Sequence, residues 1–262
     1  MLALMSALPE ELAPLRAALI GPTVTHHAGR EFVSGRLDGC AVVLVLARIG
    51  KVAAAITATL LVERFGVQAI IFTGVAGGLH RDARVGDVVV ARELLQHDLD
   101  ASPLFPRHEV PLTGRSRLAA DADLADALAT AARDALAVES QALAASWSAL
   151  GIVAPRVHQG LVLSGDRFVA TAAEGNALRR ELPDALAVEM EGAALAQVCH
   201  DCDVPFAVLR AISDRADDQA HVDFGRFLRE VAGPLSAAIV RRWIFNAAAR
   251  PASPQSPAPP PP

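Results

Sequence analysis

The stretch from Ala187 to Asp217, AVEMEGAALAQVCHDCDVPFAVLRAISDRAD, constrains the fold more than any other part of the sequence. It has the pattern of a strand end, a helix of small residues, a turn at Val204-Pro205 and a buried strand, FAVLRAI. Arg210 interrupts this apolar strand, and a buried charge without a partner is costly. Asp214 follows at the carboxyl end of the strand, where open α/β sheets place their ligands. The stretch therefore predicts an α/β fold with a charged crevice at one edge of its sheet.

Two acids precede the small-residue helix of this stretch. Glu189, Met190 and Glu191 stand where a strand gives way to a helix, so we expect an acid there to face the crevice. An alternative is a structural ion pair between Arg210 and an acid, because buried charges are usually paired. These residues alone leave both interpretations open.

The composition excludes several classes of protein. A formal charge of −5 and 4% aromatic residues without any Tyr argue against a nucleic-acid groove or a series of base-stacking platforms. Three cysteines, an odd number, indicate a reducing compartment. The start lacks a basic segment before its apolar residues, and no apolar run has membrane-spanning length. We expect a soluble cytoplasmic enzyme that binds neither membrane nor nucleic acid.

The order of patterns predicts one α/β domain, with a central mixed, twisted β-sheet flanked by helices. Arg250 to Pro262 is almost wholly Pro, Ala and Ser, so we assign residues 1–247 to the domain and 248–262 to a disordered tail. The predicted strands are 2–5, 31–37, 41–47, 68–73, 88–90 and 156–163, and the predicted helices begin at Pro9, Lys51, Asp121, Ala172 and Phe224.

Several motifs have a functional and a structural interpretation. The glycines from Gly74 to Gly78 lack the spacing of a dinucleotide-binding turn, and Lys51 alone does not make a phosphate loop, so we expect it to be solvated at the surface. His97, Asp98 and Asp100 are better explained as a polar strand end than as metal ligands. The C-x-x-C pair of Cys199 and Cys202 has no second pair, and it lies at a helix end. We therefore expect neither a metal nor a cofactor.

Three further features stay open from the residues alone. Glu10 suits the helix dipole, whereas Glu11 follows the first strand directly and could face the crevice. Phe168 follows a strand and could stack on a base, although the usual burial of Phe favours the core. The loop Ala101 to Gly114 carries the apolar residues Leu104, Phe105 and Val110, and an exposed loop of this kind is either a lid or a contact with another subunit.

Specific motifs follow one another along nearly the whole body of the chain. They are ALPEEL at 7–12, IGKVAAA at 49–55, TGVAGG at 73–78, VGDVVV at 85–90, HD at 97–98, SGDRFV at 164–169, AVEMEGAA at 187–194, VPF at 204–206 and RAISDRAD at 210–217. In this order they resemble the nucleoside phosphorylase/nucleosidase superfamily, and within it the bacterial 5′-methylthioadenosine/S-adenosylhomocysteine nucleosidases. The resemblance is weaker from Ala119 to Ala154 and absent in the tail.

The resemblance implies catalytic roles at the matched positions. Asp214 would be the general acid at adenine N7, oriented by Ser213, and would need to stay protonated near neutral pH. Glu11 would activate water, with Arg210 helping to fix that water and Glu11. Glu191 would hold the ribose hydroxyls and favour an oxocarbenium-like transition state. The implied reaction releases adenine from the nucleoside by hydrolysis.

The resemblance also implies a binding surface and a partner. Phe168 would stack on adenine, and the homodimer partner would receive the loop 101–114. The other implied contacts are the backbones of Met190 at the ribose and Val169 at the Watson–Crick edge, Gly77 near the substrate, and Leu8, Ile49 and Phe224 around the 5′-thio group.

Three positions bear on the nucleophile. Phosphorylases of this superfamily carry an Arg and a Ser where this chain has Phe72 and Val75, and an apolar pair cannot neutralise phosphate. We therefore favour water. The nucleosidases usually have Ser at the position of Val75, and Arg48 replaces a small residue. A phosphorylase with phosphate at Arg48, or a nucleosidase for another purine nucleoside, is the alternative.

Overall fold

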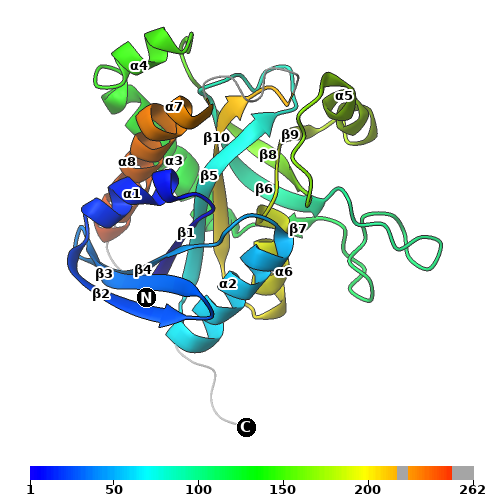
Figure 1. Ribbon diagram of the computed structural model, residues 1–262, viewed down its shortest axis with the longest axis horizontal. Helices are drawn as coiled ribbons and strands as arrows, with labels where there is room; N and C mark the ends of the chain where they lie inside the picture. The colour runs from blue at the N-terminus through cyan, green and yellow to red at the C-terminus, as the bar shows by residue number, and fades with distance from the viewer. Residues whose placement is uncertain (217–223, 250–262) are drawn as a thin grey trace.

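The computed structural model describes residues 1–216 and 224–249, and its strands join in one sheet (Figure 1). The sheet is built from β1 (Leu2–Ser6), β2 (Ile20–His27), β3 (Arg30–Leu37), β4 (Cys40–Leu46), β5 (Ala69–Gly78), β6 (Val88–Gln96), β7 (Leu118–Ala119), β8 (Val157–Ser164), β9 (Ala185–Glu189) and β10 (Phe206–Asp214). Parallel and antiparallel pairs occur together, so the predicted mixed sheet is confirmed.

Strand β5 lies at the centre of the sheet and pairs with β1, β9 and β10. The path runs β10-β6-β8-β9-β5-β1-β4-β3-β2, and the additional β10–β5 pairing closes its first part into a ring. Strands β5 and β10 are parallel, so Gly77 and Asp214 meet at their carboxyl ends. This arrangement brings the carboxyl ends of β5 and β10 together at one end of the ring.

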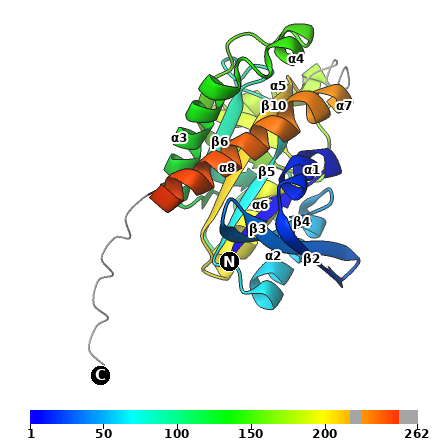
Figure 2. The same ribbon diagram turned by 90° about the vertical axis from the view of Figure 1, so that its left-hand side faces the viewer.

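Two layers of helices cover the sheet (Figures 1 and 2). Helices α1, α3 and α8 pack with one apolar cluster that includes Leu4, Leu44 and Ile71, and α2 and α6 pack with another that includes Met5 and Phe72. The helices are α1 (Pro9–Ala17), α2 (Lys51–Phe65), α3 (Ala122–Glu139), α4 (Ala144–Ala149), α5 (Ala172–Glu181), α6 (Gly192–Asp201), α7 (Phe224–Phe227), a π-helical turn (Leu228–Ala232) and α8 (Gly233–Ala249).

The structure differs from the predicted elements in several places. The edge strand β2 was not predicted, because its residues are almost all exposed and carry no alternating pattern. The glycine-rich segment 74–78 is the continuation of β5 rather than a turn. The helical pattern from Asp121 to Leu150 divides into α3 and α4.

The predicted domain boundary lies near the end of α8, which extends to Ala249. The predicted tail from residue 250 onward, and Asp217 of the RAISDRAD motif, lie outside the described residues. Within the described residues, every helix is too short or too polar to cross a membrane.

The segment between β6 and β7 projects from the body (Figure 1). It is anchored by His108, whose Nε2 lies 2.9 Å from Oε1 of Glu181 on α5, and by Arg107, whose Nη1 lies 3.0 Å from the same oxygen. Leu104 and Leu112 are among its most exposed side chains, whereas Val110, which was also expected on the exposed loop, is buried. The predicted loop 101–114 thus presents apolar groups to its surroundings.

Candidate active site

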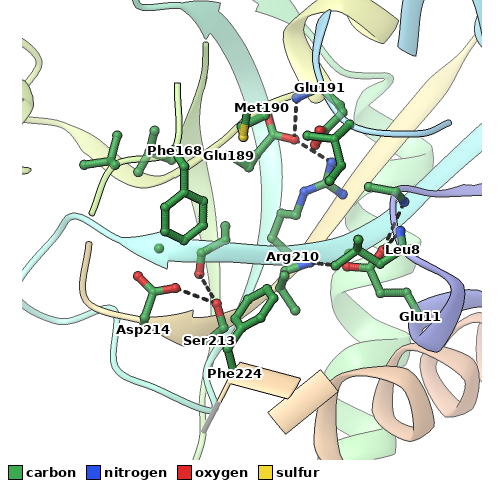
Figure 3. Close-up of a pocket in the computed structure, with 18 of the residues that line it drawn as sticks. Leu8, Glu11, Phe168, Glu189, Met190, Glu191, Arg210, Ser213, Asp214 and Phe224 are labelled. Atoms are coloured by element: carbon green, nitrogen blue, oxygen red, sulfur yellow. Dashed lines mark hydrogen bonds and ion pairs between the residues drawn. The ribbon is translucent and has the colours of Figure 1, made fainter. Parts of the chain in front are cut away.

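A pocket of about 180 Å³ opens where α1, β5, β9 and β10 meet (Figure 3). All twelve side chains or backbone segments predicted for the site line it: Leu8, Glu11, Ile49, Gly77, Phe168, Val169, Met190, Glu191, Arg210, Ser213, Asp214 and Phe224. Its other lining residues are Ala7, Gly74, Val75, Ala76, Arg167, Val188 and Glu189. The residues come from segments far apart in the sequence, which the sheet brings to one end.

Glu11 is buried at the first turn of α1 and is held entirely by backbone groups. Its Oε2 accepts hydrogen bonds from the N–H groups of Ala7 and Leu8 at 3.0 and 2.9 Å, and Oε1 accepts one from Val75 at 3.1 Å. Burial raises the pKa of Glu11, while Leu8 N–H and the charge of Arg210 oppose that rise. A buried carboxylate with a raised pKa suits a general base.

Asp214 ends β10 and lies close to the backbone of β5. Its Oδ1 accepts a hydrogen bond from Ala216 N–H at 2.8 Å, and its Oδ2 lies 2.7 Å from the Ser213 hydroxyl. That hydroxyl is also 3.4 Å from the carbonyl oxygen of Ala76. When Ser213 donates to Ala76, its oxygen can accept a proton from a neutral Asp214. The contacts therefore suit both protonation states of the acid.

Gly77 allows the Asp214 carboxyl group to lie close to the backbone of β5. A Cβ atom at position 77 would lie 2.9 Å from Oδ1 of Asp214 and 3.1 Å from Cβ of Ala216. Only glycine therefore fits beside the acid without displacing it.

Glu191 stands just before α6 and is bound across the pocket to the start of α2. Its Oε1 accepts a hydrogen bond from Gly50 N–H at 2.8 Å. Burial and then the nearby charge of Glu189 raise the pKa of Glu191 to about 8. The side chain is thus poised to change its charge near neutral pH.

Arg210 forms an ion pair with Glu189, with Nη2 of the arginine 2.7 Å from Oε2 of the acid. Its Nη1 donates to the carbonyl oxygens of Phe72 and Leu209, and its guanidinium lies 4.1 Å from the centre of the Phe72 ring. A structural ion pair was the alternative interpretation of Arg210, and the structure contains it. Glu11 lies near Arg210, because both side chains approach the same glycine, Gly74. A Cβ atom placed on Gly74 would lie 3.1 Å from Oε1 of Glu11 and 3.5 Å from Nη1 of Arg210.

An apolar rim surrounds the mouth of the pocket. Ile49 and Phe168 are 58% and 44% exposed, whereas Leu8 and Phe224 are half-buried against the core. Phe168 therefore lies in the pocket wall, and its ring faces the interior in Figure 3. The general tendency of Phe to be buried gave the wrong preference at this position, because the ring follows a strand at the open end of the sheet.

The phosphorylase superfamily model matches residues 1–244. The chain belongs to the phosphorylase superfamily. A 5′-methylthioadenosine/S-adenosylhomocysteine nucleosidase of Anoxybacillus flavithermus is 40% identical over 232 residues, which cover 88% of this chain and 92% of that protein.

Solved structures of the superfamily share this fold. The nucleosidase of Neisseria meningitidis in complex with methylthio-immucillin-A has a TM-score of 0.82 and 34% identity, covering 94% of this chain and 98% of that one. The nucleosidase of Colwellia psychrerythraea in complex with adenine has a TM-score of 0.81 and 33% identity, covering 93% and 94%.

Arg48, which departs from the superfamily pattern, does not line the pocket. Its backbone is left-handed, with φ of 66°, and its Nη2 donates to the carbonyl oxygen of Gly29 in the β2–β3 turn. Val75 does line the pocket, and its backbone rather than its side chain bonds Glu11.

Lys51 was expected to be solvated, and this prediction is wrong. Its Nζ donates to Asp98 at 2.6 Å and to Gln96 at 3.1 Å, so the lysine joins α2 to the end of β6. Asp98, considered earlier as a metal ligand, is the partner of this lysine. Among the described residues, no group of three or more His, Cys, Asp or Glu side chains is arranged to hold a metal.

Glu189 also lines the pocket, although no role at the site was predicted for it. The doubled acid in AVEMEG was the available signal, but a sequence pattern does not show which of two nearby acids turns toward Arg210. The structure assigns the ion pair to Glu189 and leaves Glu191 facing the start of α2.

Proposed function

We propose that this chain hydrolyses the N-glycosidic bond of 5′-methylthioadenosine and S-adenosylhomocysteine, releasing adenine and the thioribose product. The observation that carries the proposal is the convergence of Glu11, Glu191 and Asp214 on one pocket with an apolar rim. Breaking a purine N-glycosidic bond needs a proton for the leaving base and stabilisation of positive charge on the sugar. Hydrolysis also needs a base for water, and the three carboxyl groups can supply these functions.

Asp214 acts as the acid that protonates adenine N7 as the bond breaks. Its contact with Ser213 allows the carboxyl group to be neutral before the reaction and charged after it. Phe168 supplies a flat apolar surface for the base, and the backbone of Val169 reads the Watson–Crick edge.

Glu11 removes a proton from water, and Glu191 with the Met190 backbone binds the ribose hydroxyls. The Arg210 guanidinium lies beside Glu11 and opposes the burial that raises its pKa. Negative charge at Glu191 favours the oxocarbenium-like transition state of the sugar. The 5′-thio substituent lies against Leu8, Ile49 and Phe224.

The charges around the pocket favour water over phosphate as the nucleophile. Of its described lining residues, Glu11, Glu189, Glu191 and Asp214 are acidic, and Arg167 and Arg210 are basic. Both arginines are paired with acids, Arg167 with Glu174 and Arg210 with Glu189. Arg48 is directed to the β2–β3 turn. A phosphate dianion would therefore find both lining arginines already paired with acids.

A phosphate-controlled product assay tests the proposal. The purified protein is incubated with 5′-methylthioadenosine or S-adenosylhomocysteine, with and without phosphate, and free adenine is measured. We expect equal adenine release in both buffers, and a free sugar rather than its 1-phosphate. Absence of adenine in every condition would reject the proposal, and strict dependence on phosphate would replace it with a phosphorylase.

We also propose that the enzyme is a cytoplasmic homodimer with loop 101–114 at its interface. The support is the exposure of Leu104 and Leu112 on the projecting loop and of Val52 and Ile56 on one face of α2. Sedimentation analysis of the wild type and of Leu104→Asp tests the dimer. We expect a dimer that weakens in the variant, and a wild-type monomer at micromolar concentration would contradict it.

A further inference from the structure

Glu189 is surrounded by donors on both carboxylate oxygens. Its Oε2 accepts from Arg210 Nη2 at 2.7 Å, from Glu191 N–H at 3.1 Å and from Gly192 N–H at 2.9 Å. Its Oε1 accepts from Gly192 N–H at 2.9 Å and from the hydroxyl of Ser164. The side chain is only 3% exposed. Its acceptor capacity is thus committed to the protein rather than to a ligand.

These contacts join β8, β9, β10 and the start of α6 at one carboxylate. Ser164 ends β8 and also accepts a hydrogen bond from Ala193 N–H at 2.7 Å, while Gly192 begins α6. Arg210 belongs to β10 and Glu189 itself to β9. Removal of this carboxylate would leave the first turn of α6 and the arginine without their common partner.

The direction of Arg210 depends on this pair. The pair with Glu189 fixes Nη2, and the carbonyl oxygens of Phe72 and Leu209 fix Nη1. Because both of its terminal nitrogens are held, the guanidinium stays near Oε1 of Glu11, and both groups lie beside Gly74. A simple helix cap would explain the bonds to Glu191 and Gly192, but it would not require an arginine from another strand.

We propose that Glu189 is a positioning residue, which holds Arg210 beside Glu11 and holds the backbone of Glu191 so that the latter's side chain faces the ribose. This inference rests on the proposed function, since it assigns Glu11 to water and Glu191 to the sugar. Glu189 itself does not touch the substrate; it acts through Arg210 and through the start of α6.

Glu189 also contributes charge at the site. The groups facing Glu191 are Glu189 on β9, Arg210 on β10, Glu11 on α1 and the N–H of Gly50 before α2. After burial, Glu189 is the largest cause of the raised pKa of Glu191, while Gly50 and Arg210 lower it. Loss of the Glu189 charge must therefore lower the pKa of Glu191.

Two substitutions separate the charge of Glu189 from its geometry. Glu189→Gln removes the charge and one strong acceptor, so kcat should fall ~10²-fold through misplacement of reacting groups. In the plot of kcat/KM against pH, the limb on which activity rises should move to lower pH by about one unit, because the pKa of Glu191 falls. Glu189→Asp keeps the charge but has a shorter arm, so kcat should fall while the limb stays in place.

Glu93→Gln is a matched control, because Glu93 forms an ion pair with Arg117 at the surface. We expect this control to keep the wild-type kcat and pH profile. Ser164→Ala removes one partner of Glu189 and leaves the Arg210 pair, so kcat should fall by ~3- to 10-fold. Adenine release from 5′-methylthioadenosine is measured for all variants, together with thermal unfolding.

The measurements distinguish a positioning role from a purely structural role and from failure of the proposed function. Wild-type kcat and an unmoved limb in Glu189→Gln, with only a lower Tm, would show a purely structural role and overturn the inference. Glu189→Gln can fail to fold, because it leaves a buried arginine unpaired. In that case Glu189→Asp and Ser164→Ala decide, and wild-type kcat in both would overturn it. Failure of the wild type to release adenine would instead reject the proposed function.

Discussion

The floor and the rim of the pocket are built in opposite ways. On the floor, Glu11, Glu191 and Asp214 are 1%, 6% and 9% exposed, and each accepts a hydrogen bond from a backbone N–H group. On the rim, Ile49 and Phe168 are half exposed and belong to connecting segments. The floor is held by backbone hydrogen bonds to its buried carboxylates, whereas the rim presents exposed apolar area.

Under the proposed function, this contrast corresponds to different parts of the reaction. Groups that act on the transition state must be held in place before the substrate arrives, which the buried floor provides. Apolar area at a mouth contributes to binding of ground state and transition state alike. Substitutions in the floor should therefore change kcat, and those in the rim should change KM.

Asp214→Asn should have the largest effect. Asparagine retains the shape of the side chain but cannot deliver a proton to the base, so kcat should fall by ~10²–10⁴-fold. Steady-state adenine release measures the loss, and circular dichroism shows that the fold is retained. Full activity in a folded Asp214→Asn variant would disprove the assignment of the floor to acid catalysis.

Glu191→Gln should change how stability depends on pH. The pKa of Glu191 is raised from 4.5 to about 8 in the folded chain, so the folded state binds one more proton than the unfolded state between these values. Stability from this group is therefore lost as pH rises through that window. We expect similar Tm values for variant and wild type below pH 4.5, and a more stable variant at pH 9. A difference in Tm between variant and wild type that stays constant from below pH 4.5 to pH 9 would contradict the raised pKa of Glu191 at the floor.

Phe168→Ala should separate the rim from the floor. An aromatic contact is worth about 0.5–1.5 kcal/mol beyond area burial, so KM should rise ~10-fold, with kcat within ~3-fold of the wild type. Initial rates over a range of 5′-methylthioadenosine concentrations give both constants. A loss confined to kcat would place Phe168 with the catalytic groups instead.

Val75→Ser should have the smallest effect. Glu11 is bound by the backbone N–H of residue 75, which the substitution keeps, and the added hydroxyl can donate one further hydrogen bond to water. We expect a gain in kcat of no more than ~5-fold, since a hydrogen bond is worth about 1 kcal/mol. A change of two orders of magnitude would mean that this side chain, rather than Glu11, controls the nucleophile.

Much of the floor could be predicted because its residues lie in motifs with strong local signals. Asp214 ends an apolar strand, and Glu191 precedes a small-residue helix, so both positions follow from the sheet topology. The choice between Glu189 and Glu191 as the partner of Arg210 could not be predicted, because it depends on the direction of two side chains separated by one residue.

Features that depend on contacts distant in sequence were also missed. Lys51 has no local pattern that points to Asp98, and the edge strand β2 forms against β3 without a buried face of its own. Glycine is common in turns, so the run 74–78 predicts a turn, but β9 and β10 extend the ladder along it.

The two N–H groups at the start of α2 have consequences for the biosynthesis of the protein. Gly50 donates to Glu191 and Lys51 donates to Asp166, across 141 and 115 residues of sequence. A nascent chain that has left the ribosome only as far as α3 contains neither acceptor. The start of α2 therefore acquires its two acceptors only after most of the chain has been made, and a product truncated before Asp166 would lack both.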